Sequence, residues 1–254
     1  MRGRIRLTIL AVTVGAALAT GAAAADAHTL VPEVSAAGAQ SDPYAPGTSG
    51  YDASFPQCGA TAPAGSFAIV GVNGGRPFSD NSCLRAEYSA APAAPAPSLY
   101  INSGFSKAYR SDISTDCSNL SLGVAGLKAQ QQAWAIGCTE AESSIDYANQ
   151  QGATMVSMWW VDVETGNSWS STNPSLNRYT IQGIVTRLAR NGLPVGIYSS
   201  PGAWATITGG SFTPLGISAD WEAPGGACAG TGFTSSPEWL VQSLTAGFDS
   251  DLAC

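Results

Sequence analysis

The candidate groups for acid–base catalysis in this chain are carboxylates, because its single histidine lies close to the N-terminus. That residue, His28, follows a small-residue stretch that predicts a signal cleavage position, so it stands outside the domain that comes after it. A Ser-His-Asp triad, a Cys-His pair and a histidine-ligated zinc site are therefore excluded for that domain. Aspartate and glutamate side chains remain as candidates for proton transfer, and tyrosines can assist them.

The clearest pattern is an apolar run, Met158 to Val161, that ends in two carboxylates separated by one residue, Asp162 and Glu164. Because side chains alternate along a strand, both carboxylates are expected to point the same way. Two carboxylates crowded in a partly desolvated site repel each other, so one keeps its proton to a higher pH and can act as a general acid. The alternative is an acidic strand end that is solvated or paired with arginine.

Three further aspartates can join this pair. Asp52 ends the short apolar run that opens the domain, and Asp249 and Asp251 follow the last predicted strand. In a closed barrel the first and last strands are neighbours, so Asp52 and one of the later aspartates are expected beside Asp162 and Glu164. Each aspartate alone is typical of a turn or a cap. Together they predict a carboxylate-lined pocket, which is what glycosidic bond cleavage requires.

From residue 50 onward, short runs rich in Val, Ile and aromatic residues alternate with helix-like stretches, which is typical of parallel βαβ units. The predicted strands are Gly50 to Ala53, Ser66 to Asn73, Ser98 to Ser103, Met155 to Glu164, Val195 to Ser199, Gly216 to Asp220 and Trp239 to Leu244. The predicted helices are Asn177 to Arg190, and Leu127 to Gln151 with a break near Gly137-Cys138.

This alternation predicts an α/β fold, a compact single-domain (β/α) TIM-like barrel with room for irregularity. An open, doubly wound sheet is the alternative. The first predicted strand is followed by Phe-Pro-Gln-Cys-Gly and not by a Gly-rich phosphate loop, and the glycines within residues 71–75 have the wrong spacing for one. We therefore expect no nucleotide site.

The N-terminus has the features of a secretory signal: arginines at positions 2, 4 and 6, an apolar run to about Leu18, and small residues up to Ala27. We expect residues 1–27 to be a signal peptide, 28–49 a flexible leader and 50–254 the folded domain. The apolar run is short for a membrane span, and no later stretch reaches roughly 18 apolar residues. The sequence therefore predicts a secreted, extracellular protein without a membrane span.

All six cysteines lie in the predicted domain, and an even number in an exported chain indicates disulfides in preference to metal ligation. They form three local couples along the sequence, although the spacing alone allows other pairings. The expected pairs are Cys58 with Cys83, Cys117 with Cys138, and Cys228 with Cys254.

The chain is acidic, with 11 basic and 18 acidic residues and a formal charge of −7. An acidic surface repels nucleic acid, so no nucleic-acid partner is expected. We also expect a monomer, with no metal and no organic cofactor.

Four motifs resemble those of glycoside hydrolase family 25, the Chalaropsis-type lysozymes that cut peptidoglycan. Gly-Tyr-Asp-Ala-Ser at 50–54 is similar to the family's G-x-D-x-S, and Trp-Trp-Val-Asp-Val-Glu at 159–164 resembles its W-x-D-x-E strand. Val-Gly-Ile-Tyr-Ser-Ser at 195–200 resembles its G-x-Y-[ST] element, and residues 241–252 resemble its closing Q-x-(S/T)…D-x-N. The resemblance covers most of the predicted domain.

The resemblance implies a role for each matching residue. Glu164 would be the general acid, and Asp162 would be the nucleophile or would orient the substrate's own N-acetyl group. Asp52 and Asp251 would tune this pair and hold the sugar. The remaining residues expected to contact substrate are Tyr198, Trp221, Trp160, Asn102 and Gln242. Ordinary core packing is the alternative for Tyr198 and Trp221.

The sequence is therefore compatible with two alternative functions. The first is a secreted glycoside hydrolase acting on peptidoglycan or a related N-acetylated glycan. The second is a barrel of the same descent that binds a glycan or a protein without hydrolysis. Two departures motivate the second function: residues 99–104 read Leu-Tyr-Ile-Asn-Ser-Gly in place of the family's tyrosine-histidine-phenylalanine run, and the closing motif lacks its asparagine.

Overall fold

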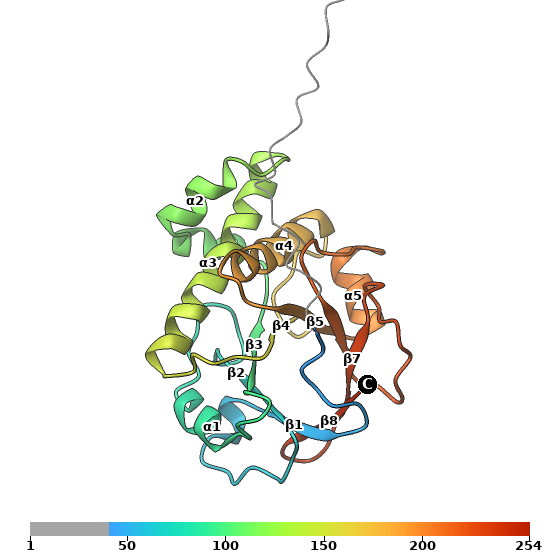
Figure 1. Ribbon diagram of the computed structural model, residues 1–254. Helices are drawn as coiled ribbons and strands as arrows, with labels where there is room; N and C mark the ends of the chain where they lie inside the picture. The colour runs from blue at the N-terminus through green and yellow to red at the C-terminus, as the bar shows by residue number, and fades with distance from the viewer. Residues whose placement is uncertain (1–40) are drawn as a thin grey trace, which may run out of the picture.

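The computed structural model describes residues 41–254 and contains a closed barrel of eight strands in sequential order (Figure 1). Neighbouring strands from β1 to β7 are parallel, whereas β8 runs antiparallel to both β7 and β1. The strands are β1 Ser49–Ala53, β2 Ala68–Gly71, β3 Ser98–Asn102, β4 Trp159–Asp162, β5 Val195–Ser199, β6 Ala219–Glu222, β7 Glu238–Ser243 and β8 Asp249–Ala253. The predicted barrel is confirmed, and the open doubly wound sheet is wrong.

The described helices connect the strands up to β6 and lie outside the barrel (Figure 1). Between β6 and β8 the described residues form only turns, bends and strands, so no helix connects these last strands. The helices are α1 Leu84–Ala90, α2 Thr115–Ser121, α3 Lys128–Gln150, α4 Pro174–Arg190 and α5 Pro201–Thr208, with 3₁₀ turns η1 Phe55–Gln57 and η2 Lys107–Asp112. None of these helices is long and apolar enough to cross a membrane.

Alternation along the strands divides the buried residues into an outer and an inner core. In β4, Val161 packs with residues of α3 and α4 in the outer core, while Trp160 packs inside the barrel with Trp221 of β6. Asp162 comes two residues after Trp160 and therefore faces the same interior, one step nearer the mouth. The fold thus carries the side chains of successive strand ends toward one opening.

Helix α3 is continuous, so the expected break at Gly137-Cys138 is wrong. Gly137 lies instead where α3 crosses α4: a Cβ there would come 1.9 Å from the Thr180 carbonyl oxygen. A Cβ on Gly183, across the crossing, would come 2.1 Å from the Trp134 carbonyl oxygen. The glycines therefore allow the two backbones to pack closely and do not terminate the helix.

Strand β8 was not predicted, because Asp249-Ser250-Asp251 has none of the apolar content of an ordinary strand. The strand pairs Asp249 with Asp52 and Asp251 with Gly50 across β1. Its main-chain hydrogen bonds close the barrel, and Ala253 packs in the inner core. Pairing with two neighbours stabilises this polar segment as a strand.

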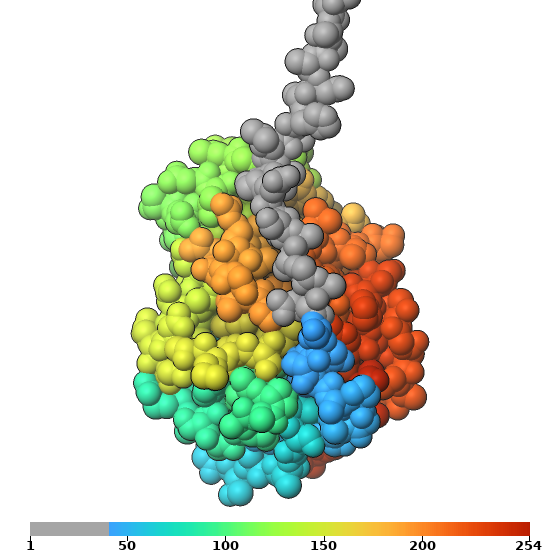
Figure 2. Space-filling view, in the orientation of Figure 1, coloured from blue at the N-terminus to red at the C-terminus, as the bar shows by residue number. Residues whose placement is uncertain are grey.

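The expected flexible leader is wrong for its last residues, because Tyr44 is 3% exposed and packs against Phe67 in the inner core. The Tyr44 hydroxyl contacts Ser98 Oγ at 2.6 Å and accepts the Trp160 indole N–H at 3.0 Å. Gly47 donates its amide to the Ala253 carbonyl, and the space-filling view shows these first described residues (blue) against the C-terminal strands (red) (Figure 2). The folded unit therefore begins before residue 50.

The three expected disulfides are present: Cys58–Cys83, Cys117–Cys138 and Cys228–Cys254. They tie η1 to the start of α1, α2 to α3, and the β6–β7 connection to the end of β8. The predicted signal peptide, and the predicted leader up to residue 40, lie outside the described residues.

Candidate functional site

A cavity of about 190 Å³ opens where the carboxyl ends of the parallel strands meet, the position at which barrels of this type carry their sites. Of the nine residues expected at the site, seven line this cavity, and Asp251 and Trp160 do not. The lining residues are Asp52, Tyr100, Asn102, Asp162, Glu164, Tyr198, Trp221, Gln242, Leu244 and Asp249.

Asp162 and Glu164 occupy different depths of this cavity. Asp162, the last residue of β4, is 2% exposed, and one of its oxygens accepts a hydrogen bond from the Asn102 amide while Oδ1 has no partner among the described residues. Burial first, and then the charges of Glu164 and Asp52, hold the pKa of Asp162 well above its usual value. Glu164 is exposed at the mouth, and partial burial together with Asp249 raises its pKa. The pair therefore retains a proton at a pH where separate carboxyls would both be ionised.

Asp52 lies on the opposite side of the mouth and is held by a chain of hydrogen bonds. The Tyr198 hydroxyl donates to Gln242 Oε1 at 2.8 Å, and Gln242 Nε2 donates to Asp52 Oδ2 at 2.7 Å. Burial raises the pKa of Asp52 to about 7. Gln242 and Tyr198 thus fix the orientation of a carboxyl that changes its charge near neutral pH.

The two aspartates of β8 have different places. Asp249 pairs with Asp52 across the strands and lines the cavity, so it is the later aspartate that joins Asp162 and Glu164 there. Asp251 is fully buried one step deeper, where burial and the charge of Asp52 hold its pKa well above its usual value. The expectation that Asp251 holds the sugar is therefore wrong, because a side chain with no exposed surface cannot touch a substrate.

Aromatic rings form the floor of the cavity. Trp221 lines the cavity, and its ring centroid lies 4.4 Å from that of Tyr198. The Tyr100 ring packs edge-on against Trp221, with a centroid distance of 6.4 Å. Trp160 lies beneath Trp221 and has no exposed surface, so the expectation that it contacts substrate is wrong. Gly196 of β5 leaves the space that the Trp160 ring fills, since a Cβ there would come 2.2 Å from the ring.

A buried polar network behind Asn102 was missed by sequence reasoning. Asn73 Nδ2 donates to the Asn102 backbone carbonyl at 2.9 Å and to Glu140 Oε1 at 3.1 Å, while the Asn102 backbone N–H donates to Asn73 Oδ1 at 3.1 Å. Burial raises the pKa of Glu140 to about 7. A glutamate within the apolar part of a long helix was the available signal. The network fixes Asn102, and through it the Asp162 carboxyl.

The loop that carries Glu164 is held by Trp169, a second residue that sequence reasoning missed. The indole N–H of Trp169 donates to the Glu164 carbonyl at 2.8 Å, and the Phe105 amide donates to the Ser168 carbonyl at 2.7 Å. These two hydrogen bonds connect the loop to itself and to the segment after β3. Glu164 is therefore exposed but held on a fixed backbone.

The lining of this cavity includes four carboxylates and no lysine, arginine or histidine. Within residues 41–254, no group of His, Cys, Asp and Glu is arranged to hold a metal ion. What the arrangement offers is proton donation and acceptance beside an aromatic floor, with Asn and Gln amides as hydrogen-bonding groups for a polar ligand.

Residues 123–218, which include Asp162, Glu164 and Tyr198, match the family described as lysozyme-like protein 1. Over these residues the chain is similar to that family. The match supports the lysozyme resemblance of the two motifs that lie within it, at 159–164 and 195–200.

Two solved structures are similar to this chain at low identity. A muramidase from Trichobolus zukalii is 16% identical with a TM-score of 0.46, covering 81% of this chain and 93% of that one. An uncharacterized B. stearothermophilus protein is 14% identical with a TM-score of 0.45, covering 82% and 96%. Both are too distant to bear on function. No curated protein matches the chain.

Proposed function

We propose that the protein is a secreted glycoside hydrolase that cleaves peptidoglycan or a related N-acetylated glycan by carboxylate acid catalysis. The observation that carries this proposal is the convergence of Asp52, Asp162, Glu164 and Asp249 on one cavity at the barrel mouth, without a basic side chain. The lysozyme-like match over β4 supports it. The three disulfides support a place outside the cytoplasm.

Glu164 is the general acid in this proposal. It is the exposed member of the pair, so its carboxyl can reach a glycosidic oxygen in a bound chain. Its pKa is already raised by burial and by Asp249, and a bound sugar would remove more water from it and raise its pKa further. Glu164 therefore holds a proton for the leaving group to a higher pH than an isolated glutamate would.

Asp162 orients the substrate. It lies deeper, is fixed on one side by Asn102, and keeps one oxygen without a partner among the described residues. Although that oxygen is buried, Asp162 lines the cavity, and in this proposal its carboxyl orients a group of the reacting sugar, such as the N-acetyl amide, which could then assist the reaction. Asp52 and Asp249 face the pair across the mouth and keep its proton affinity high.

The proposal is tested by incubating the protein with purified bacterial cell walls between pH 5 and 7 and measuring the release of reducing ends. We expect release by the native protein and a loss of about 10²- to 10⁴-fold in Glu164→Gln, the usual range for a general acid. Glu87→Gln, on α1 and outside the cavity, is the matched control and should retain activity.

Absence of release by the native protein from cell walls and from N-acetylglucosamine polymers would contradict hydrolysis. Saturable glycan binding without turnover would then support the second function, a binding barrel. Equal activity of the Glu164→Gln and native proteins would contradict the assignment of the acid.

A further inference from the structure

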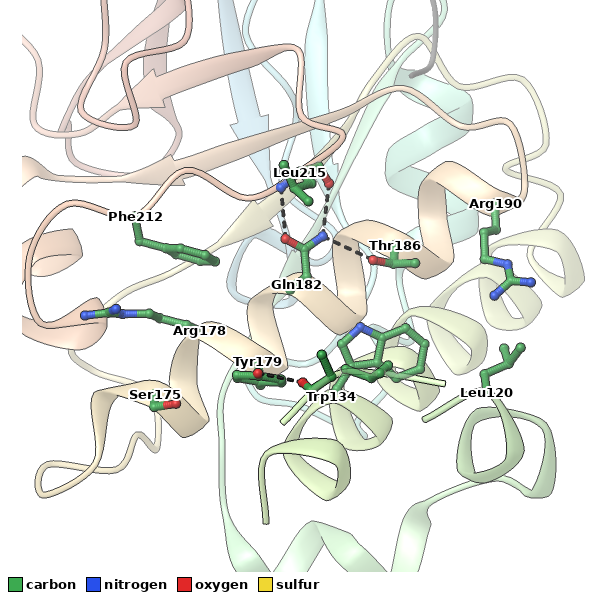
Figure 3. A pocket seen from close by; sticks show the side chains of 12 residues that line it. Leu120, Trp134, Ser175, Arg178, Tyr179, Gln182, Thr186, Arg190, Phe212 and Leu215 are labelled. Carbon is green, nitrogen blue, oxygen red and sulfur yellow. Dashed lines mark hydrogen bonds between the residues drawn. The ribbon is translucent and has the colours of Figure 1, made fainter. Parts of the chain in front are cut away.

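A second cavity, of about 380 Å³, lies on the outer face of α4 and shares no lining residue with the barrel mouth (Figure 3). One wall is formed by Leu120 of α2 and by Val124 in the connection from α2 to α3. The other is the connection from α5 to β6, with Phe212 and Leu215. Trp134 of α3 is 4% exposed at its base. The cavity is thus a groove with mainly apolar walls.

Most polar groups along this groove already have partners within the protein. The Tyr179 hydroxyl donates to the Ala125 carbonyl at 2.7 Å and so holds one wall to α4. Gln182 holds the other wall, since it accepts the Leu215 amide at 2.9 Å and donates to the Leu215 carbonyl at 3.0 Å (Figure 3). These contacts fix both walls and leave few polar groups free for a ligand.

The charge of the groove is opposite to that of the chain. Its lining includes Arg178 and Arg190 and no acidic residue, in a chain with a formal charge of −7. Arg178 donates to the Thr208 carbonyl, whereas Arg190 is exposed and takes part in neither ion pair formed by the described residues, both of which use Arg187. Arg190 is therefore available to an anion.

The dimensions suit a small linear ligand. Arg178 and Arg190 are twelve positions apart on α4, which corresponds to about 18 Å at 1.5 Å per residue. Figure 3 shows them at opposite ends of the groove, with Tyr179 and Trp134 between them. The cavity volume falls in the range of roughly 300 to 1,000 Å³ that is typical of small-molecule sites.

We propose that this groove binds a small amphiphile of the fatty-acid class, with one carboxylate at Arg190 and a linear apolar chain over Trp134 and Tyr179. The apolar lining accounts for the chain and the free arginine for the carboxylate. The site is separate from the barrel mouth, so its occupation does not depend on glycan hydrolysis.

The test is titration of the full protein with decanoate below its micelle concentration, followed by calorimetry and by amide chemical shifts. We expect saturable 1:1 binding, with shifts confined to α4 and the two walls. Decyltrimethylammonium, which has the same chain and the opposite charge, should bind at least about tenfold more weakly, because a charge-assisted hydrogen bond is lost and a repulsion gained.

Arg190→Gln should weaken decanoate binding about tenfold, whereas Arg110→Gln, an exposed arginine on η2, should leave it unchanged. Leu215→Asp should weaken it further, with an unchanged near-UV spectrum as evidence of folding. Absence of saturable binding, equal binding of the two amphiphiles, or unaltered affinity in Arg190→Gln would each overturn the proposal.

Discussion

Asp162, Asp52 and Asp251 share one physical condition, burial beside other carboxyls, which raises the pKa of each above its ordinary value. Amide groups orient two of them: Asn102 contacts Asp162, and Gln242 contacts Asp52. Glu164 differs because it is exposed and depends on its backbone for its position. The position of each carboxyl therefore depends on the residues that hydrogen-bond to it as well as on the strand that carries it.

Trp169 is a positioning residue for Glu164, and Trp169→Phe tests this role. Phenylalanine keeps an aromatic ring but cannot donate to the Glu164 carbonyl, which costs about 1 kcal/mol. We expect kcat on cell walls to fall several-fold with KM nearly unchanged. Trp204→Phe removes a similar indole–carbonyl bond, to Phe212 in the α5 region, and should leave kcat unchanged.

A parallel fall in kcat and thermal stability in both variants would show that Trp169 acts only in packing. A rise in KM alone in Trp169→Phe would mean that the residue affects substrate binding and does not position the acid.

The part of the site that depends on local residue spacing was predicted from the sequence. The alternation of side chains along a strand predicted that Asp162 and Glu164 share one face, and closure of the barrel predicted that Asp52 lies near them. The same alternation gave a wrong prediction for Trp160. This residue shares the face of Asp162 but lies deeper, buried inside the packed barrel. The burial of Glu140 had a signal in its apolar helix, but its contact with Asn73 could not be predicted, because it joins α3 to the segment after β2, far away in sequence.

At the scale of elements, the strands with apolar alternation were predictable and those defined by their neighbours were not. Strand β8 forms because β7 and β1 present main-chain groups on both sides of it. Tyr44 has no periodic context, yet three contacts bury it at the barrel base. Helix α3 continues through Gly137 because close packing on α4 outweighs the low helix propensity of glycine.

Gly137→Ala tests this helix crossing. The added Cβ would come within 1.9 Å of the Thr180 carbonyl, so the helices must separate, and we expect a loss of at least about 2 kcal/mol in the free energy of unfolding. Gly202→Ala in α5 is the control, because nothing lies within 4 Å of its Cβ and the added methyl group therefore meets no clash. Denaturant unfolding measures both, and equal stability of the two variants would contradict the close crossing.

At the scale of the whole molecule, raised carboxyl pKa values make stability depend on pH. Burial raises the pKa of Asp52, Glu140 and Asp220 to about 7, whereas unfolded carboxyls titrate near their ordinary values of about 4. Between these values the folded state binds more protons than the unfolded state, so the free energy of unfolding falls as pH rises. The contribution is fully present below about pH 4 and is lost by about pH 7.

We therefore expect a higher Tm at pH 5 than at pH 8 by calorimetry at constant ionic strength. Glu140→Gln keeps the size of the side chain and removes one of the titrating groups, so the difference between the two Tm values should shrink. A Tm that rises from pH 5 to pH 8, or a difference unaltered in Glu140→Gln, would contradict the raised pKa values.

The two cavities give the molecule two regions of opposite charge, an acidic barrel mouth and a basic, apolar groove on α4. The acidic mouth is central to the proposed hydrolysis. The most direct measurement is a crystal structure of Glu164→Gln soaked with an N-acetylated oligosaccharide. We expect a sugar over Trp221, with a glycosidic oxygen within hydrogen-bonding distance of the residue 164 side chain. An oligosaccharide bound only elsewhere, or one whose glycosidic oxygens all lie beyond reach of residue 164, would contradict the proposed hydrolysis.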